Sequence, residues 1–291
     1  MGNPISVTVR VPATTSNLGP GYDCLGVALR IYNDVAVQRA SRPARPLNDP
    51  MAAEAASAFF VEAKCRPFRF SWRVTGDVPV SRGLGSSVTV RMGIIAGLNA
   101  LAGSPLDRQA IFQLCARLEG HPDNAAPAAF GGFTVCDPAG AVPLRVPVEP
   151  ELHFVLLVPD FEVRTAEARS ILPAQVSRLA AVASAGRACR IVAAFATRRY
   201  ALLRGMFADE AFHQSHRAGL VPMLKSVVGA GEAAGALGGF LSGSGSTICC
   251  VTLKLPARVA DAMLRVAGRG RTFHVLADNR GFVIRPAKST R

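Results

Sequence analysis

The amino-acid sequence predicts an α+β fold. Several segments alternate apolar and polar residues, which is typical of half-buried strands. Other segments are alanine-rich or apolar nearly all round, which is typical of helices that pack in a core. The chain has 291 residues, and 49% of them are apolar. This length and apolar content allow one large domain or two lobes.

The first half of the chain opens with strand character. Residues 5–14 alternate and then break at Pro12, and residues 27–40 predict a second strand region. A proline-rich turn follows at residues 41–50. Asp49 is placed to cap the next helix, with Pro50 at its first position. The remaining elements of this half are helices at 51–63, 90–103 and 105–120 and strands at 68–80, 130–137 and 141–148.

The second half predicts a similar mixture of elements. Its strands are expected at 152–160 and 272–286, with a strand–turn–strand region at 238–256, and its helices at 174–212, 220–234 and 257–268. No internal repeat is visible. A lobe boundary is expected near Glu149 and Pro150, which divides the chain into residues 1–150 and 151–291.

The charge of the chain is strongly basic. Thirty-three lysines and arginines against twenty acidic residues leave a net charge of +13. This balance fits a nucleic-acid binder, and it also fits an enzyme for anionic substrates. The basic residues are scattered, no run of five occurs, and one tryptophan and three tyrosines offer little stacking surface. The scatter favours the enzyme.

The cysteines and the start of the chain indicate the compartment. Seven cysteines without a Cys-X-X-Cys pair predict reduced thiols rather than a disulfide framework or a zinc site. We see no charged leader with an apolar core and no uninterrupted apolar run long enough to cross a bilayer. We therefore expect a cytoplasmic protein with no membrane partner.

The stretch VSRGLGSSVT, residues 80–89, is suited to binding phosphate. A helix N-terminus offers backbone N–H groups and the positive end of a dipole. Gly83 and Gly85 allow close approach of the backbone, and Ser86 and Ser87 add hydroxyls. The stretch lacks the Gly-Lys-Ser/Thr ending of a P-loop. The alternative is an ordinary glycine loop with a serine N-cap.

Three further loops are rich in polar groups. Residues 12–26 include Asn17 and Asp23, residues 119–132 begin with Glu119, His121, Asp123 and Asn124, and residues 242–247 form a second glycine–serine turn. Loops of this kind are more typical of binding sites than of a core.

These motifs resemble a known family. In chain order, VPATTSNLGPGYDCLG, VPVSRGLGSSVT, EGHPDNAAPAAFGG, VRTAEARSILP, HQSHR and LSGSGST make the sequence similar to the homoserine kinases of the GHMP small-molecule kinase superfamily. The resemblance implies a two-lobed fold with a ribosomal-protein-S5-like N-terminal lobe and a ferredoxin-like C-terminal lobe. It also implies phosphorylation of L-homoserine for threonine synthesis, with ATP and Mg²⁺, by a homodimer.

The resemblance implies a role for each motif residue. The residues expected to bind ATP are Pro79, Val80, Ser81, Arg82, Gly83, Leu84, Gly85, Ser86, Ser87, Val88 and Thr89. Ser87 and Glu119 would hold Mg²⁺, an ion that prefers hard oxygen ligands. Without the resemblance, Glu119 would be interpreted as a surface carboxylate at a helix end.

The expected substrate pocket takes a zwitterion. Asp23 would bind the ammonium, and Arg169 and Arg217 would grip the carboxylate with paired hydrogen bonds. By resemblance, Asn17, His121 and Thr165 also line the pocket, and Asn124 orients the attacking hydroxyl, so that Asn124, Arg217 and Glu119 form the catalytic set. For the loop residues the alternative is loop capping, and for the arginines a solvated helix face. Asp123 is placed either to act as a base or to brace its loop.

Several residues depart from the family pattern. Val88 and Thr89 replace smaller residues at the helix start, Arg91 is unusual in an otherwise apolar helix, and the segment from Asn33 to Asp49 is short. Two other functions therefore stay open: a GHMP kinase for a different small alcohol, and a non-catalytic nucleic-acid-binding relative. The second would show salt-sensitive binding of RNA or DNA and no binding of ATP.

Overall fold

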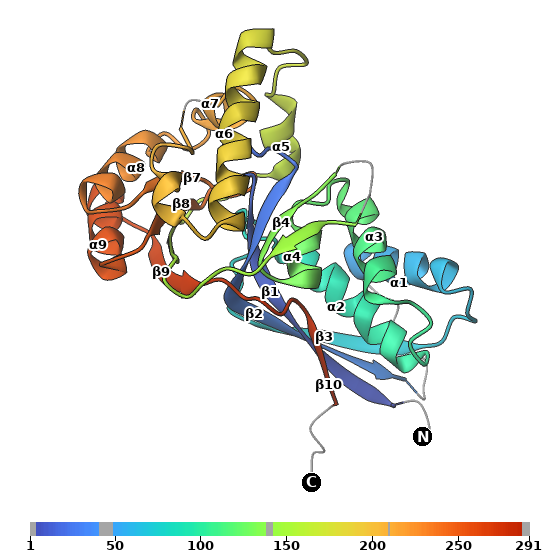
Figure 1. Cartoon of the computed structure of the whole chain (residues 1–291). Helices are drawn as coiled ribbons and strands as arrows, with labels where there is room; N and C mark the ends of the chain where they lie inside the picture. The colour runs from blue at the N-terminus through green and yellow to red at the C-terminus, as the bar shows by residue number, and fades with distance from the viewer. Residues whose placement is uncertain (1–3, 41–48, 138–141, 209, 287–291) are drawn as a thin grey trace.

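The chain folds into two lobes, each built on an antiparallel sheet (Figure 1). The computed structural model describes residues 4–40, 49–137, 142–208 and 210–286. Helices cover the sheets in both lobes. The α+β class predicted from the sequence is confirmed.

The sheet of the first lobe combines strands from both ends of the chain. Its strands are β1 (Ser6–Ser16), β2 (Leu25–Arg39), β3 (Phe70–Gly76), β4 (Phe133–Val135), β5 (Leu144–Val146) and β10 (Val283–Pro286). They run in the order β10-β1-β2-β4-β5, with β3 paired to β2. The predicted break at Pro12 is wrong, because β1 continues to Ser16. The register instead shifts between Pro12 and Ala13, which is where a residue without an N–H group fits a strand.

Four helices are described in this lobe. They are α1 (Pro50–Glu62), α2 (Ser86–Leu101), α3 (Arg108–Glu119) and α4 (Ala125–Phe130). The Asp49 side chain accepts from the N–H groups of Met51 and Ala52 at 2.9 and 3.1 Å, which confirms the predicted cap of α1. The predicted burial of α2 is also confirmed: its Ile94, Ile95 and Leu98 side chains have no exposed surface.

The second lobe has the connectivity of a split β-α-β fold. Its strands are β6 (His153–Val158), β7 (Gly238–Leu241), β8 (Ile248–Thr252) and β9 (Arg271–Leu276), in the order β7-β8-β6-β9. Its helices are α5 (Thr165–Ser170), α6 (Arg178–Ala196), α7 (Gln214–Arg217), α8 (Leu224–Ala233) and α9 (Pro256–Ala267), with a 3-10 turn at Tyr200–Leu203. This arrangement is the expected ferredoxin-like lobe.

Two sequence predictions need correction. The long helix predicted over residues 174–212 is wrong: α6 begins at Arg178 and ends at Ala196, where Thr197 caps it and Arg198 turns into the left-handed region with φ 57°. The helix predicted over 220–234 begins later, at Leu224. The proline-rich turn falls largely on residues 41–48, outside the described residues.

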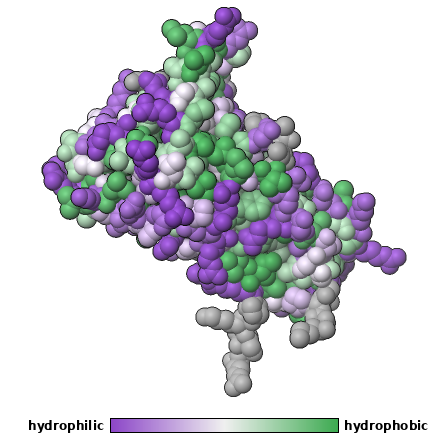
Figure 2. Space-filling model, viewed as in Figure 1, coloured by the Kyte–Doolittle hydropathy of each residue, from purple (hydrophilic) through white to green (hydrophobic). Residues whose placement is uncertain are grey.

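Helix α6 also bears on the membrane prediction. In Figure 1 it projects from the second lobe, and Figure 2 shows pale green, apolar residues along this projection. By length and composition α6 could cross a membrane, although it is not an uninterrupted apolar run, and 22% of its most apolar window is buried. Arg187 and Arg190 lie within it, and a buried arginine costs about 2.5–3.5 kcal/mol at a bilayer centre. One such helix is weak grounds for a membrane span.

The end of the chain returns to the first lobe. Strand β10 pairs with β1 through Val7 to Arg10, so the last described residues complete the first sheet. The proposed division at residue 150 places β10 in the second segment, 151–291. In space this strand belongs to the first sheet.

Candidate active site

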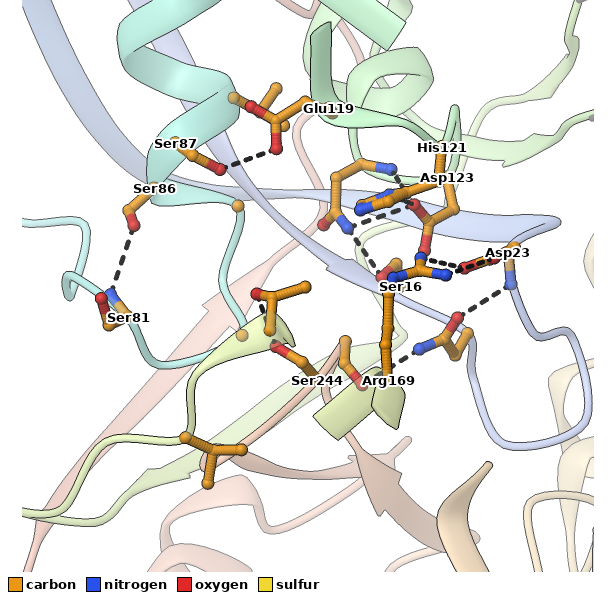
Figure 3. Close-up of a pocket in the computed structure, with 18 of the residues that line it drawn as sticks. Ser16, Asp23, Ser81, Ser86, Ser87, Glu119, His121, Asp123, Arg169 and Ser244 are labelled. Atoms are coloured by element: carbon orange, nitrogen blue, oxygen red, sulfur yellow. Dashed lines mark hydrogen bonds and ion pairs between the residues drawn. The ribbon is translucent and has the colours of Figure 1, made fainter. Parts of the chain in front are cut away.

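A polar cavity of about 430 Å³ lies where the two lobes meet. Figure 3 shows its labelled side chains approaching from several elements. The first lobe supplies the ends of β1 and α3 and the start of α2, and the second lobe supplies α5, Arg217 and the turn at Gly243 and Ser244. Segments far apart in sequence therefore build one site.

The glycine loop ends at an uncapped helix. Gly85 is the N-cap of α2 in the left-handed conformation, with φ 67°. Among the described residues, no side chain forms a capping hydrogen bond there, so the serine N-cap considered from the sequence is wrong. Ser86 and Ser87 are instead the first helical residues and line the cavity. The free N–H groups and the helix dipole make this corner suitable for an anion.

A second glycine turn supports the loop from the other lobe. Ser242 Oγ donates to the carbonyl oxygen of Gly83 at 2.7 Å, and the N–H of Thr247 donates to the carbonyl oxygen of Arg82 at 3.2 Å. Arg82 itself donates to the carbonyl oxygens of Pro159 and Asp160. The position of the glycine loop thus depends on contacts between the lobes.

Gly83→Ala is expected to damage this loop. Gly83 has φ 73°, and an added Cβ would lie 2.1 Å from the carbonyl oxygen of Ser242. Gly120, with φ 81° and open space around it, is the matched control. Gly120→Ala should cost only the left-handed strain of about 1–2 kcal/mol. Gly83→Ala should cost more and weaken ATP binding, as measured by denaturant unfolding and calorimetry. Equal losses in both variants would contradict the close contact.

The predicted metal ligands lie side by side. Ser87 Oγ donates to Glu119 Oε2 at 2.8 Å, as the dashed line in Figure 3 marks. The other oxygen of Glu119, Oε1, accepts from Arg91 Nη1 at 2.6 Å. The Glu119 side chain is only 7% exposed. It is therefore a fixed, nearly buried carboxylate, and the surface interpretation considered from the sequence is wrong.

Asp23 and Arg169, expected at opposite ends of a substrate, contact each other. The Arg169 guanidinium donates to the two carboxylate oxygens of Asp23 at 2.8 and 3.1 Å. It also donates to Tyr22 Oη at 2.9 Å. The side chain of Asn17 accepts from the N–H of Asp23 at 3.0 Å. The two charges neutralise each other beside the cavity.

Arg217 is a buried cation. Its side chain donates to the carbonyl oxygens of Ala168 and Gly243 and to Nδ1 of His213, and it is 2% exposed. Within the described ranges, no acidic side chain forms an ion pair with it. Burial lowers the pKa of Arg217. A buried guanidinium that lines a cavity without an acidic partner is suited to an anionic ligand.

His213 is a buried hydrogen-bond partner of Arg217. Its Nε2 lies 2.9 Å from the carbonyl oxygen of Gly19, and its ring stacks on Tyr22 with centroids 5.4 Å apart. Burial lowers the pKa of His213 to about 3. The imidazole is therefore neutral, with Nε2 donating to Gly19 and Nδ1 accepting from Arg217.

His121, Asp123 and Asn124 form a linked group. His121 Nδ1 lies 2.6 Å from Asp123 Oδ1, which also accepts from the N–H of Asn124 at 2.9 Å. The amide of Asn124 donates to Ser16 Oγ and accepts from Thr14 Oγ1. Burial alone would raise the pKa of Asp123 and lower that of His121. The contact between them outweighs burial, so the pKa of Asp123 is lowered and the pKa of His121 is raised. The contacts of Asp123 brace its loop.

The pair should make stability depend on pH. Because the folded-state pKa of His121 is raised, its stabilising effect is present below its unfolded pKa of about 6.5 and lost as pH rises through the folded value. The free energy of unfolding of the parent should thus exceed that of His121→Gln more at about pH 5.5 than at about pH 8.5. Urea unfolding at both pH values measures this. A difference that grows toward high pH would contradict the ion pair.

Not every expected residue lines the cavity. Those in the cavity wall are Asn17, Asp23, Ser81, Gly83, Gly85, Ser86, Ser87, Val88, Glu119, His121, Asn124, Thr165, Arg169 and Arg217. Those of the glycine segment outside it are Pro79, Val80, Arg82, Leu84 and Thr89. Leu84 has no exposed surface and packs in the core, and Thr89 Oγ1 accepts from Asn33. Leu84 and Thr89 thus anchor the loop to the core of the first lobe.

Sequence reasoning missed other parts of the wall. Arg91, Ser16, Arg164 and Ser244 line the cavity, and Tyr22 and His213 hold its arginines. The sequence offered a signal for Arg91, because it is a charged residue in an otherwise apolar helix. It offered one for the pairing of His213 with Arg217 too, because residues four apart share one helical face.

Comparisons with known proteins define the class. The GHMP kinases N terminal domain matches residues 51–132, and the GHMP kinases C terminal domain matches residues 191–268. A homoserine kinase crystal structure from Cytophaga hutchinsonii has a TM-score of 0.88 at 22% identity and covers 98% of this chain and 99% of that one. A mevalonate kinase structure has a TM-score of 0.70 at 14% identity, covering 94% and 99%. The chain therefore has the two domains and the fold of the GHMP kinases.

Sequence relatives narrow the class further. Homoserine kinase of Moorella thermoacetica is 36% identical in an alignment of 274 positions that covers 90% of this chain and 92% of the relative. Homoserine kinase of Deinococcus radiodurans is 37% identical in an alignment of 303 positions that covers 97% of each chain. The chain belongs to the homoserine kinase family. The resemblance stated from the motifs is confirmed.

Proposed function

We propose that this protein transfers the terminal phosphoryl group of ATP to the hydroxyl of L-homoserine and so forms O-phospho-L-homoserine. The observation that carries the proposal is the pairing of two sites in one cavity. An uncapped helix N-terminus offers N–H groups to phosphate at one end, and Asp23, Arg169 and Arg217 offer both signs of charge at the other. The second set suits an ammonium and a carboxylate carried by one small molecule.

The residues present fit a magnesium ion beside the phosphates. Ser87 Oγ and Glu119 Oε2 are hard oxygen ligands 2.8 Å apart, and Mg²⁺ commonly takes one or two protein oxygens and keeps several waters. When bound there with ATP, the ion would neutralise charge on the phosphate oxygens. Ser87 can keep its hydrogen bond to Glu119 while its lone pair binds the metal.

The protein's part in the reaction is positioning. Phosphoryl transfer passes through a loose transition state, so alignment and charge neutralisation matter more than a strong base. The N–H groups at Gly85 and the start of α2 would hold the phosphates, and Arg217 would fix the amino-acid end. Asn124, held by Thr14 and Ser16, would orient the hydroxyl.

A panel of alcohols tests the substrate. Release of ADP should be measured with L-homoserine, mevalonate, galactose and shikimate, each with ATP and Mg²⁺. Turnover of L-homoserine alone is the expected result. Turnover of another alcohol and not of L-homoserine would favour the alternative, a GHMP kinase with a different substrate.

Assembly and location complete the proposal. We expect a cytoplasmic homodimer that binds neither nucleic acid nor membranes, since the fold and cavity need neither partner. Light scattering measures the oligomeric state. Tight RNA binding at low salt, without ATP binding, would instead support the nucleic-acid-binding alternative.

A further inference from the structure

Arg91 joins the expected metal carboxylate to a second helix. It lies on α2 one turn after Ser87, so both side chains leave the same face of the helix. Its Nη1 donates to Glu119 Oε1 on α3 at 2.6 Å, and its Nη2 donates to Glu54 Oε2 on α1 at 2.7 Å. The Arg91 side chain is 16% exposed and lines the cavity.

These contacts make the two oxygens of Glu119 unequal as metal ligands, because the positive charge of Arg91 lies against Oε1 and disfavours a cation there. Arg91 covers Oε1, while Oε2 faces Ser87. A carboxylate oxygen has two lone pairs, so Oε2 can accept from Ser87 and still bind a cation. Arg91 therefore favours binding through a single oxygen and fixes which one is used.

The charge of Arg91 has a second consequence. A guanidinium on the metal carboxylate repels a free divalent cation and attracts a polyphosphate. Its Nε is buried without a hydrogen-bond partner among the described residues, so the guanidinium keeps an unused donor.

We propose that Arg91 is a positioning residue that makes the site take the metal together with the nucleotide rather than the metal alone. It holds Glu119 in place, opposes free divalent ions by its charge, and adds attraction for the phosphates. This inference depends on the proposed metal site at Ser87 and Glu119.

Binding measurements on Arg91→Met test the inference. Mn²⁺ affinity without nucleotide is measured by electron paramagnetic resonance, and affinity for ATP in EDTA by calorimetry. We expect Mn²⁺ to bind at least about tenfold more tightly and metal-free ATP at least about tenfold more weakly. A merely structural role would weaken both. Mn²⁺ affinity that is unchanged or lower in Arg91→Met overturns the inference.

Two variants separate the causes. Arg91→Lys keeps the charge, so both affinities should stay within about threefold of the parent; a shift as large as that of Arg91→Met would contradict the role of charge.

If Arg91→Met does not fold, Arg91→Gln replaces it with the same expected results. The control is Arg117→Met. Arg117 lies on α3, like Glu119, and forms an exposed ion pair with Glu62. Breaking that pair should leave both affinities unaltered. Mn²⁺ binding that survives Glu119→Gln would disprove the metal site itself, whatever Arg91 does.

Discussion

Arg217→Ala is expected to lower kcat/KM for L-homoserine by about thirtyfold to several thousandfold while ATP affinity stays unchanged. The Arg217 side chain is 2% exposed and has no acidic partner in the described part of the chain. A substrate carboxylate bound there would be desolvated, and losing one partner of such a pair typically costs about 2–5 kcal/mol. At about 1.4 kcal/mol per tenfold change, this cost gives the stated range.

The measurement is a steady-state assay with calorimetric titration of a non-hydrolysable ATP analogue. Circular dichroism checks the fold, because Arg217 also donates to Ala168 and Gly243. Arg217→Lys keeps the charge without the planar fork and should fall between the parent and the alanine variant. An unaltered KM and kcat for L-homoserine in Arg217→Ala would show that the buried cation has a purely structural role.

Arg169→Ala is expected to raise the KM for L-homoserine at least about tenfold without affecting ATP binding. In this structure Arg169 pairs with Asp23, and the two side chains are 36% and 25% exposed. The pair is partly exposed and lines the cavity, so a ligand can reach both charged groups. A zwitterion could replace both partners at once, its ammonium on Asp23 and its carboxylate on Arg169.

This exchange gives the prediction a chemical test. An amino alcohol without the carboxylate would free Arg169 and leave it unpaired, so it should compete poorly with L-homoserine. Arg178→Ala, at the exposed start of α6, is the control and should change little. If Arg169→Ala and Arg178→Ala leave the KM equally unaltered, Arg169 belongs to the solvated face considered from the sequence.

Local patterns predicted most of the fold. The cap at Asp49, the buried helix α2 and the strand–turn–strand around Gly243 each follow from residues near one another in sequence. The end of α6 was missed because residues after 196, such as Ala201, Leu202 and Leu203, also favour helices, whereas the backbone turns at Arg198. Short helices such as α5 and α7 were missed because their few residues show too little periodicity.

The sequence predicted which residues line the site better than it predicted which of them contact each other. The motifs brought Ser87 and Glu119 together correctly. They gave no sign that Asp23 and Arg169 would pair, because these residues lie 146 positions apart. Arg91 attracted attention as a charge in an apolar helix, but its two carboxylate partners come from other helices. Long-range pairings of this kind depend on the tertiary fold.

The return of β10 to the first sheet has a consequence for synthesis on the ribosome. Strand β1 pairs with β10 along one edge and with β2 along the other. Until residues 283–286 have emerged, β1 has an open edge, and the first lobe lacks its last strand. Domains usually fold from the N-terminus onward as they are made. Here the first lobe cannot be completed before the second has been translated, so the two lobes become native almost together.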